Sequence, residues 1–244
     1  MGTEEGYNVT VVVPSGTDVK AYFAHDLAQM MAYTAQHYMK PGNLSKLNLA
    51  FQVATYIHSA RQILADASLN IGSHYTLYID SDMRFPPDAL IRLLMHGKPM
   101  VGVNCSTRNI PPRFVAIKRV TGPNGEEGEL LRTTPDSAGL EPAEAVGFGM
   151  VLIRQDVFLA LPNPTVLPWF WFDWIQGHSG MTQVGEDVHF CNLVREAGFE
   201  ILVDHDLSRK IRHIGSMEYD ITCPISYEEG MAEAEAAAEA ANEA

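Results

Sequence analysis

Cysteines and long hydrophobic runs are scarce in this 244-residue sequence. The three cysteines, Cys105, Cys191 and Cys223, are odd in number and far apart, which predicts free thiols and a reducing cytoplasm rather than a disulfide framework. No apolar run approaches the ~20 residues that cross a bilayer, so we expect no membrane partner. The acidic start, Met1 to Tyr7, lacks the basic and apolar stretches of a secretory signal.

Basic residues are also few. The chain has 17 Lys and Arg against 30 Asp and Glu, a formal net charge of −13 at pH 7. Segment 228–244 holds six of the acids and no base, so the rest has 24 acids against 17 bases, or −7. Surfaces that bind nucleic acid are normally basic, which weighs against duplex DNA as a partner but leaves room for a local basic groove.

The residues that are present alternate between strand-like and helix-like patterns. Hydrophobic residues make up 46% of the chain, which is enough for a sizeable core. β-branched runs predict strands, and apolar residues at helical spacing predict helices between them, the first capped by Asp18. This order predicts an α/β fold with a mostly parallel sheet. The expected strands are 8–13, 47–53, 76–80 and 100–103, and the expected helices are 18–39, 56–69 and about 88–95.

The second half changes character. The turn sequence 122–125, between apolar segments 114–120 and 129–133, predicts a β-hairpin. Further on we expect a strand, a helix that Gly198 terminates, and another strand, at 146–153, 185–197 and 200–203. The Ala- and Glu-rich tail 228–244 has no apolar stripe, and we expect a solvated helix or a disordered segment outside the fold.

Two aspartates directly after the expected strand 76–80 form the most informative motif, Asp80-Ser81-Asp82. The carboxyl ends of strands are where open α/β sheets bind ligands, and an unpaired charge is too costly to bury in the core. Carboxylate oxygens suit Mg²⁺ or Mn²⁺, which usually bridge a few carboxylates to phosphates. The simpler interpretation is a solvated turn.

Three further features follow in the chain. Gly147-Phe148-Gly149 belongs to a strand of small residues, where a ligand can approach the backbone closely. Glu186 and Asp187 open a helix. Acids in the first turn of a helix are stabilised by the helix dipole, which is a sufficient explanation without a functional role. Two histidines, His205 and His213, come late in the chain.

Together, in this order, these motifs resemble those of the GT-A glycosyltransferases, in particular family-two-like and phage-encoded enzymes. The resemblance implies a Rossmann-like, mixed and mostly parallel sheet flanked by helices, with a β-hairpin insertion. It implies one catalytic domain over 1–227, with a nucleotide-sugar-binding half at about 8–110 and an acceptor-binding half at about 111–227. The matching stretches are Val11–Gly16, Ser59–Gln62, Tyr78–Met83, Gly147–Arg154, Gly185–Cys191 and Arg212–Gly215.

The resemblance also implies a reaction, the metal-dependent transfer of a sugar from a nucleotide-sugar donor to an acceptor hydroxyl. Mn²⁺ or Mg²⁺ would be held by Asp82, with Asp80 beside it and facing the ribose or donor sugar. A late histidine would complete the site, His213 being preferred and His205 the competitor. In an inverting enzyme Asp187 would be the general base and Glu186 its orienting neighbour. A retaining enzyme needs no such base, so the stereochemistry stays open.

Donor and acceptor contacts follow from the same resemblance. The donor-binding candidates are Pro14, Ser15, Asp18, Arg61, Asp80, Ser81, Arg108 and Gly149. The aromatic run 169–174 alternates with period two, so Trp169, Trp171 and Asp173 would share one face. A core strand is the alternative explanation. The acceptor-binding candidates are Trp171, Asp173 and Phe148, and the glycines of 176–183 suit a mobile lid.

The sequence also bears on other classes of protein. No Gly-x-Gly-x-x-Gly follows a strand, which disfavours a dinucleotide-binding oxidoreductase. A non-catalytic nucleotide- or sugar-binding module, a metal-dependent nucleotidyltransferase and a phosphatase remain alternatives. The donor is expected to be a UDP- or GDP-sugar. A modified DNA base, a glycan, a protein and a small metabolite all remain candidate acceptors, in the host cytoplasm if the chain is phage-encoded.

Overall fold

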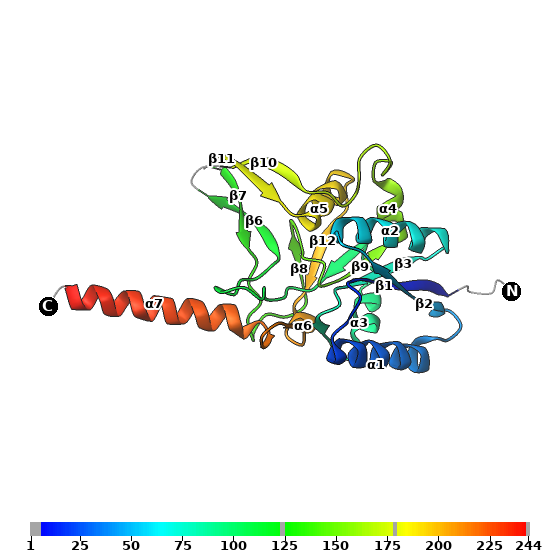
Figure 1. The fold of residues 1–244 in the computed structure, drawn as a ribbon, viewed down its shortest axis with the longest axis horizontal. Coiled ribbons are helices and arrows are strands. Elements are labelled where there is room, and N and C mark those ends of the chain that lie inside the picture. Colours follow the sequence, from blue (N-terminus) through cyan, green and yellow to red (C-terminus); the bar gives the residue numbers. More distant parts are fainter. Residues whose placement is uncertain (1–5, 123–124, 178–179, 243–244) are drawn as a thin grey trace.

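The computed structural model describes residues 6–122, 125–177 and 180–242 and is built around a seven-stranded sheet of order β2-β1-β3-β9-β5-β12-β8 (Figure 1). Five strands run in one direction, and β8 and β9 oppose their neighbours. The predicted mixed, mostly parallel sheet is therefore confirmed. Its strands are β1 (Tyr7–Ser15), β2 (Leu44–Val53), β3 (Tyr75–Ile79), β5 (Met100–Gly102), β8 (Leu140–Ala143), β9 (Met150–Arg154) and β12 (Ile201–Asp204).

Helices cover both faces of this sheet, which explains why its central strands are almost continuously hydrophobic (Figure 1). One face packs on α1 (Ala21–Tyr38), α3 (Ala89–Met95) and α6 (His205–Ser208). The other packs on α2 (Ile57–Asn70), α4 (Gln155–Ala160) and α5 (Glu186–Glu196). Each face of the sheet therefore has its own hydrophobic core. Alternate residues of β1 belong to the two cores: Val11 and Val13 pack in the first, and Val12 packs in the second.

Three small sheets accompany the main one. The expected hairpin insertion is confirmed as β6 (Ile117–Gly122) and β7 (Gly125–Leu130), and turn residues 123–124 lie outside the described residues. A second hairpin is formed by β10 (Asp173–Gly177) and β11 (Gly180–Val184), where the lid was predicted; residues 178–179 again lie outside the description. The third sheet joins β4 (Met83–Arg84), β13 (Arg212–Ile214) and β14 (Glu218–Tyr219).

Several predicted element boundaries were wrong by three residues or more, and two of them concern candidate site residues. The first helix begins at Ala21 with Lys20 as its N-cap residue, and Asp18 precedes it, so Asp18 does not cap the helix. The strand expected at 146–153 begins only at Met150. Among the described residues, no helix is long and apolar enough to cross a membrane.

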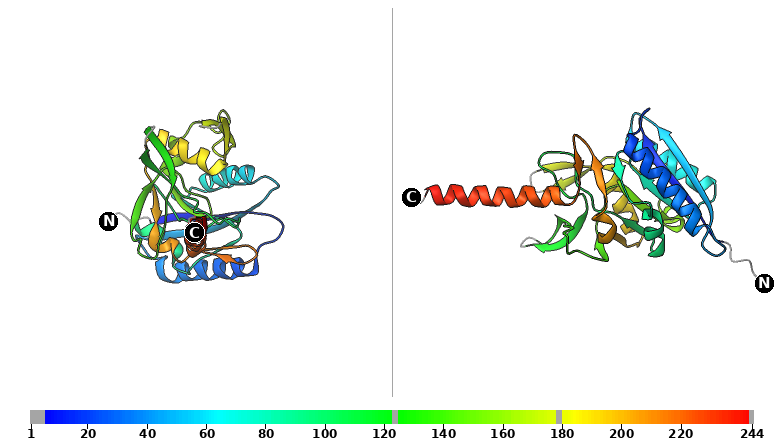
Figure 2. Two further views of the ribbon diagram at one scale, coloured as in Figure 1. Left: turned by 90° about the vertical axis from the view of Figure 1, so that its left-hand side faces the viewer. Right: turned by 90° about the horizontal axis from the view of Figure 1, so that it is seen from below.

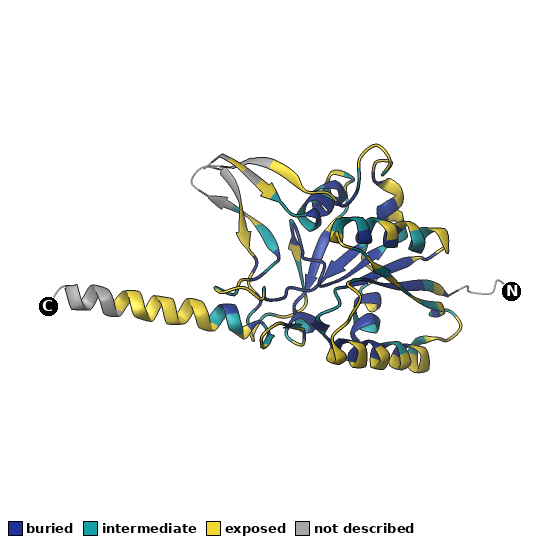
Figure 3. Cartoon of the chain, viewed as in Figure 1, coloured by how far each residue is buried: buried dark blue, intermediate teal, exposed yellow. Residues whose placement is uncertain are grey.

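The acidic tail belongs to a helix, α7 (Thr222–Asn242), which projects away from the body of the molecule (Figures 1 and 2). It begins before the predicted domain end at 227. Residues 226–236 are exposed, as the absence of an apolar stripe predicts (Figure 3). Among the described residues, an ion pair between Arg132 and Glu228 connects this exposed part to the body, and both side chains are about half-exposed.

Truncation of the chain after Tyr227 should therefore change its thermal stability very little. The loss of one exposed ion pair costs roughly 0.2–1 kcal/mol. For a domain of this size that corresponds to a fall in Tm of at most about 4 °C, measured by circular dichroism. Arg132→Ala in the full chain is the matched control, because it removes the same pair and keeps the helix. A much larger fall in the truncated chain alone would show that α7 packs on the fold.

Candidate functional site

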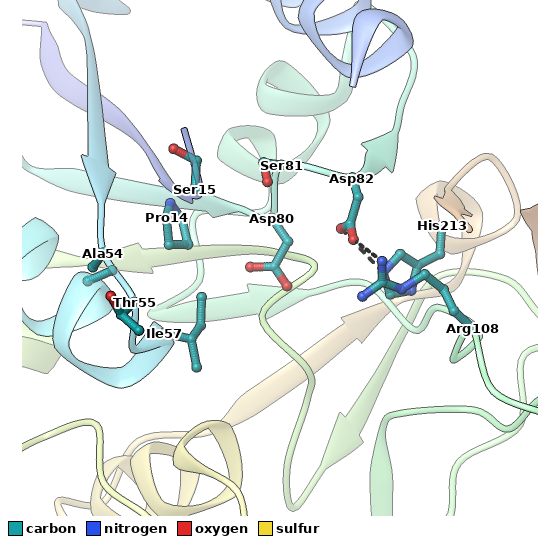
Figure 4. A pocket seen from close by; sticks show the side chains of 12 residues that line it. Pro14, Ser15, Ala54, Thr55, Ile57, Asp80, Ser81, Asp82, Arg108 and His213 are labelled. Carbon is teal, nitrogen blue, oxygen red and sulfur yellow. Dashed lines mark ion pairs between the residues drawn. The ribbon is translucent and has the colours of Figure 1, made fainter. Parts of the chain in front are cut away.

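A cavity of about 370 Å³ lies at the carboxyl edge of the sheet, where β1, β2 and β3 end (Figure 4). In open α/β sheets this edge is where ligands bind. The cavity brings together seven of the predicted site residues, Pro14, Ser15, Asp80, Ser81, Asp82, Arg108 and His213. Its other lining residues are Gly16, Ala54, Thr55, Ile57 and Ala60.

Sequence reasoning missed the part of this lining that follows β2. Ala54 and Thr55 come directly after that strand. Parallel neighbours end at the same edge of a sheet, and this rule could have identified them. Asp18 lies just outside the cavity, in a neighbouring hollow of about 420 Å³ that shares Ser81 and Asp82 with it.

Asp82 lies beside two basic side chains at one end of the cavity (Figure 4). Its Oδ2 atom is 2.6 Å from the Arg108 guanidinium, and its Oδ1 atom is 3.3 Å from His213 Nε2. Burial alone would raise the pKa of Asp82. The hydrogen bond and charge of His213, together with the charge of Arg108, outweigh burial and lower the pKa below its ordinary value.

Strand pairing brings His213 to this position. His213 lies in β13 and pairs with Met83 in β4. The next residue, Ile214, donates its N–H to the Asp82 carbonyl at 2.7 Å. The competitor, His205, is buried elsewhere and contacts Glu141 and Thr133. The geometry therefore favours His213 over His205 as the histidine beside Asp82.

The donor set at Asp82 and His213 fits a divalent cation shared with a phosphate ligand. His213 Nδ1 donates to the Ser106 carbonyl at 3.0 Å, so its Nε2 atom is the one that faces Asp82. Within the described ranges, no three His, Cys, Asp or Glu side chains form a metal site by themselves. Two protein ligands suffice for Mg²⁺-like ions, which commonly take the remainder from phosphates and water.

Asp80, the other aspartate of the motif, is engaged by a buried arginine. Arg61 donates to Asp80 Oδ1 at 3.0 Å and to Glu186 Oε1 at 2.6 Å, and its guanidinium lies 4.9 Å from the centre of the Phe148 ring. Burial would lower the pKa of Arg61, but the charges of Asp80, Glu186 and Asp187 raise it. The cation therefore stays charged, and it joins the end of β3 to the start of α5.

This geometry changes the interpretation of Arg61 and Glu186. Arg61 is only 4% exposed and is not among the residues that line the cavity, so its guanidinium faces protein carboxylates rather than a donor. Glu186 is buried against it. Asp187, the next residue, is half-buried and accepts a hydrogen bond from Val188 N–H at 2.8 Å.

The backbone around Asp187 is crowded. A Cβ atom at Gly185 would lie 2.7 Å from Asp187 Oδ1, which explains the glycine before the helix. The carboxylate of Glu186 is buried against Arg61, and Asp187 is the more exposed acid of this pair.

Two predicted binding residues are instead part of the packing. Phe148 is 2% exposed and lies among the rings of Tyr78, Phe170 and Phe190, so its side chain does not bind an acceptor. At Gly149, a Cβ atom would lie 3.1 Å from Met83 Cε and 3.2 Å from Cys105 Sγ. The close approach there is to core side chains, and Gly149 does not line the cavity.

The aromatic run 169–174 does not form the predicted single strand. Trp169 and Phe170 are both buried, and β10 begins only at Asp173. Trp171 is 51% exposed. The Asp173 carboxylate lies 3.5 Å from His189 Nδ1 on α5.

The two buried cysteines favour the protonated thiol at neutral pH. Burial raises the pKa of both Cys105 and Cys191 to about 12. Both are free thiols, as the sequence predicted.

Comparison with known proteins relates this architecture to solved structures. No protein-family model and no curated protein matches the sequence. A structure described as A197 from STIV has a TM-score of 0.53 and 11% identity, covering 85% of this chain and 86% of that one. GalNAc-T7 with UDP, GalNAc and Mn²⁺ has a TM-score of 0.51 and 10% identity, covering 83% of this chain and 43% of that one. The chain has a GT-A-like fold. At these identities the likeness establishes the fold alone.

Proposed function

We propose that this chain is a metal-dependent glycosyltransferase that uses a nucleotide-sugar donor. The observation that carries the proposal is the cavity at the carboxyl edge, which has apolar and small residues at one end and Asp82, Arg108 and His213 at the other. A nucleoside fits the end formed by Pro14, Ser15 and Thr55. A diphosphate fits the basic end. The likeness to a structure that contains UDP, GalNAc and Mn²⁺ supports this kind of ligand, with a UDP- or GDP-sugar as donor.

Asp82 and His213 would hold Mn²⁺ or Mg²⁺, which supplies Lewis-acid stabilisation of the departing diphosphate. Arg108 forms an ion pair with Asp82 in the structure, and the Arg108 side chain is about half-exposed. When the charge of Asp82 is satisfied by the cation, Arg108 is free to turn to a phosphate oxygen, for which its planar guanidinium is well suited.

Asp187 would act as general base in an inverting transfer. The acceptor oxygen attacks C1 of the donor sugar, its proton passes to the Asp187 carboxylate, and the bond from C1 to the phosphate oxygen breaks with the electron pair leaving on the nucleoside diphosphate. Arg61 would position this base indirectly, because it anchors Glu186 in the same helical turn. Asp80, held by the same arginine, would face the donor ribose or sugar.

The first experiment screens UDP- and GDP-sugars by thermal shift with and without Mn²⁺, and follows release of the nucleoside diphosphate. We expect Mn²⁺-dependent stabilisation together with slow hydrolysis of one donor. Stabilisation without hydrolysis or transfer would identify a binding module on the same fold.

Asp82→Ala should weaken Mn²⁺-dependent binding of UDP or GDP at least tenfold, or about 1.4 kcal/mol. The variant removes one of the two protein ligands and leaves His213 without its partner. Isothermal titration calorimetry measures the effect. Asp156→Ala is the matched control. It removes an exposed carboxylate of α4 that pairs with Arg154 and does not line the cavity. Undiminished Mn²⁺-dependent binding in Asp82→Ala would contradict the metal assignment.

A further inference from the structure

An aromatic cluster lies on the surface beside the cavity and is formed by Tyr56, His58, Trp171 and Phe172. The ring of His58 is at its centre, at centroid distances of 5.7 Å from Tyr56, 5.6 Å from Trp171 and 5.4 Å from Phe172. The two contacts with Trp171 and Phe172 are edge-to-face. Two chain segments more than a hundred residues apart thus contribute to one cluster.

The cluster is unusually exposed for its apolar content. Tyr56 is 65% exposed, Trp171 51% and Phe172 37%. Apolar surface of this kind, gathered in one place, marks interaction sites more often than surface side chains that are scattered singly. The Nδ1 atom of His58 is enclosed without a hydrogen-bond partner in the structure. Retaining such a group has a cost, and here the ring is held in place by its aromatic neighbours.

The cluster lies next to the donor cavity. Tyr56 lies between Thr55 and Ile57, which both line the cavity. On the other side, Asp173 follows Phe172 directly and lies 3.5 Å from His189, in the same helix as Asp187. A ligand on the rings would therefore lie beside the donor cavity and beside the Asp173 carboxylate.

Charge decides which ligand suits this surface. The Asp173 carboxylate, which directly follows Phe172 in the chain, is exposed, and the chain without its tail segment 228–244 still carries a formal net charge of −7. A phosphodiester strand would be repelled, because binding of polyanions depends on Lys and Arg contacts. A neutral sugar offers an apolar C–H face to an aromatic ring and hydroxyl groups to Asp173, and aromatic side chains combine with a few polar groups in this way in ligand sites.

We infer that the cluster of Tyr56, His58, Trp171 and Phe172 binds a neutral carbohydrate, which serves as the acceptor. This inference rests on the proposed glycosyltransferase function for the word acceptor, but the binding surface itself does not depend on it. It selects the glycan among the acceptor classes that the sequence left open, and it excludes a nucleic acid.

The test is saturation-transfer NMR on the full chain with a panel of neutral methyl glycosides (glucose, galactose, mannose, xylose, rhamnose and N-acetylglucosamine) and an eight-residue oligothymidylate. We expect at least one glycoside to receive saturation in the unaltered protein. Trp171→Ala should weaken that binding about tenfold, and Tyr56→Ala should weaken it as well. Trp174→Ala is the matched control, because Trp174 is 57% exposed on the same segment without belonging to the cluster.

Three outcomes would overturn the inference: no glycoside binds, binding is equal in Trp171→Ala, or oligothymidylate binds in a Trp171-dependent manner. Melting curves for each variant show that the fold is retained. Donor hydrolysis measured on the same samples keeps the two proposals separate. Hydrolysis without glycoside binding would remove this inference and leave the proposed function. Trp171-dependent glycoside binding without any nucleotide binding would do the reverse.

Discussion

Asp187→Asn should lower the rate of sugar transfer by about 10²–10⁴-fold and leave the affinity for nucleotide and Mn²⁺ nearly unchanged. Asparagine has the shape of aspartate and can still accept the hydrogen bond from Val188 N–H, which the carboxylate accepts at 2.8 Å. It cannot take up the proton of the acceptor hydroxyl. Asp187 does not line the donor cavity, so we expect the affinity for the donor to stay the same.

The measurement combines transfer rates for the best donor with calorimetric affinities for its nucleoside diphosphate. Asp156→Asn is the matched control, since it makes the same change at a half-exposed carboxylate that pairs with Arg154 and has no role in the proposed site. The anomeric configuration of the product, read by NMR, is the second criterion. Near-normal turnover in Asp187→Asn, or a product with retained configuration, would remove Asp187 as the base without affecting the assignment of Asp82.

The architecture could be read from the sequence because hydrophobic periodicity and chain order determine it. The β-branched run in β1 and the apolar run in β3 are both buried, and each ends where a turn residue or an aspartate was seen. The site followed from the same logic, since strand ends of a parallel sheet meet at one edge. Even the position of His213 was predicted in part, although its pairing with β4 was not.

What the sequence could not show were contacts between distant segments. Arg61 and Glu186 are 125 residues apart, and nothing local indicates that one guanidinium joins both motifs. Local patterns were also ambiguous. The glycine at 149 suited a ligand, but Met83 and Cys105 fill that space. The alternating aromatics at 169–174 suited a strand, yet the first two are buried, the next two are exposed ahead of β10, and only Trp174 lies in that strand.

Arg61→Met should destabilise the fold more than any surface change, by about 3–5 kcal/mol. The substitution leaves Asp80 and Glu186 without the cation that both contact, at 3.0 Å and 2.6 Å. Methionine approximates the length of the arginine stem, so most of the packing against Phe148 is kept and the missing charge dominates. For a domain of this size the expected fall in Tm is roughly 10 °C. Arg154→Met, which breaks an exposed pair with Asp156, should cost no more than about 1 kcal/mol.

The deficit should shrink as the pH falls. Burial already raises the pKa of Asp80, and the charge of Arg61 opposes that effect. Without Arg61 the pKa of Asp80 rises further above its unfolded value, so the folded state binds more protons and gains stability at acid pH. Chemical denaturation of both proteins between pH 7 and pH 5 measures the convergence. A constant deficit across this range would show that lost packing, rather than lost charge, destabilises the variant.

A triple variant separates the positioning role of Arg61 from its contribution to stability. In Arg61→Met with Asp80→Asn and Glu186→Gln, no uncompensated carboxylate remains in the buried cluster, and much of the lost stability should return. If Arg61 fixes the turn that carries Asp187, the rate of transfer should stay below that of Asp80→Asn alone although the fold is restored, because a small misplacement of a catalytic group is costly. Recovery of both Tm and transfer rate would show that Arg61 only balances charge and does not position the base.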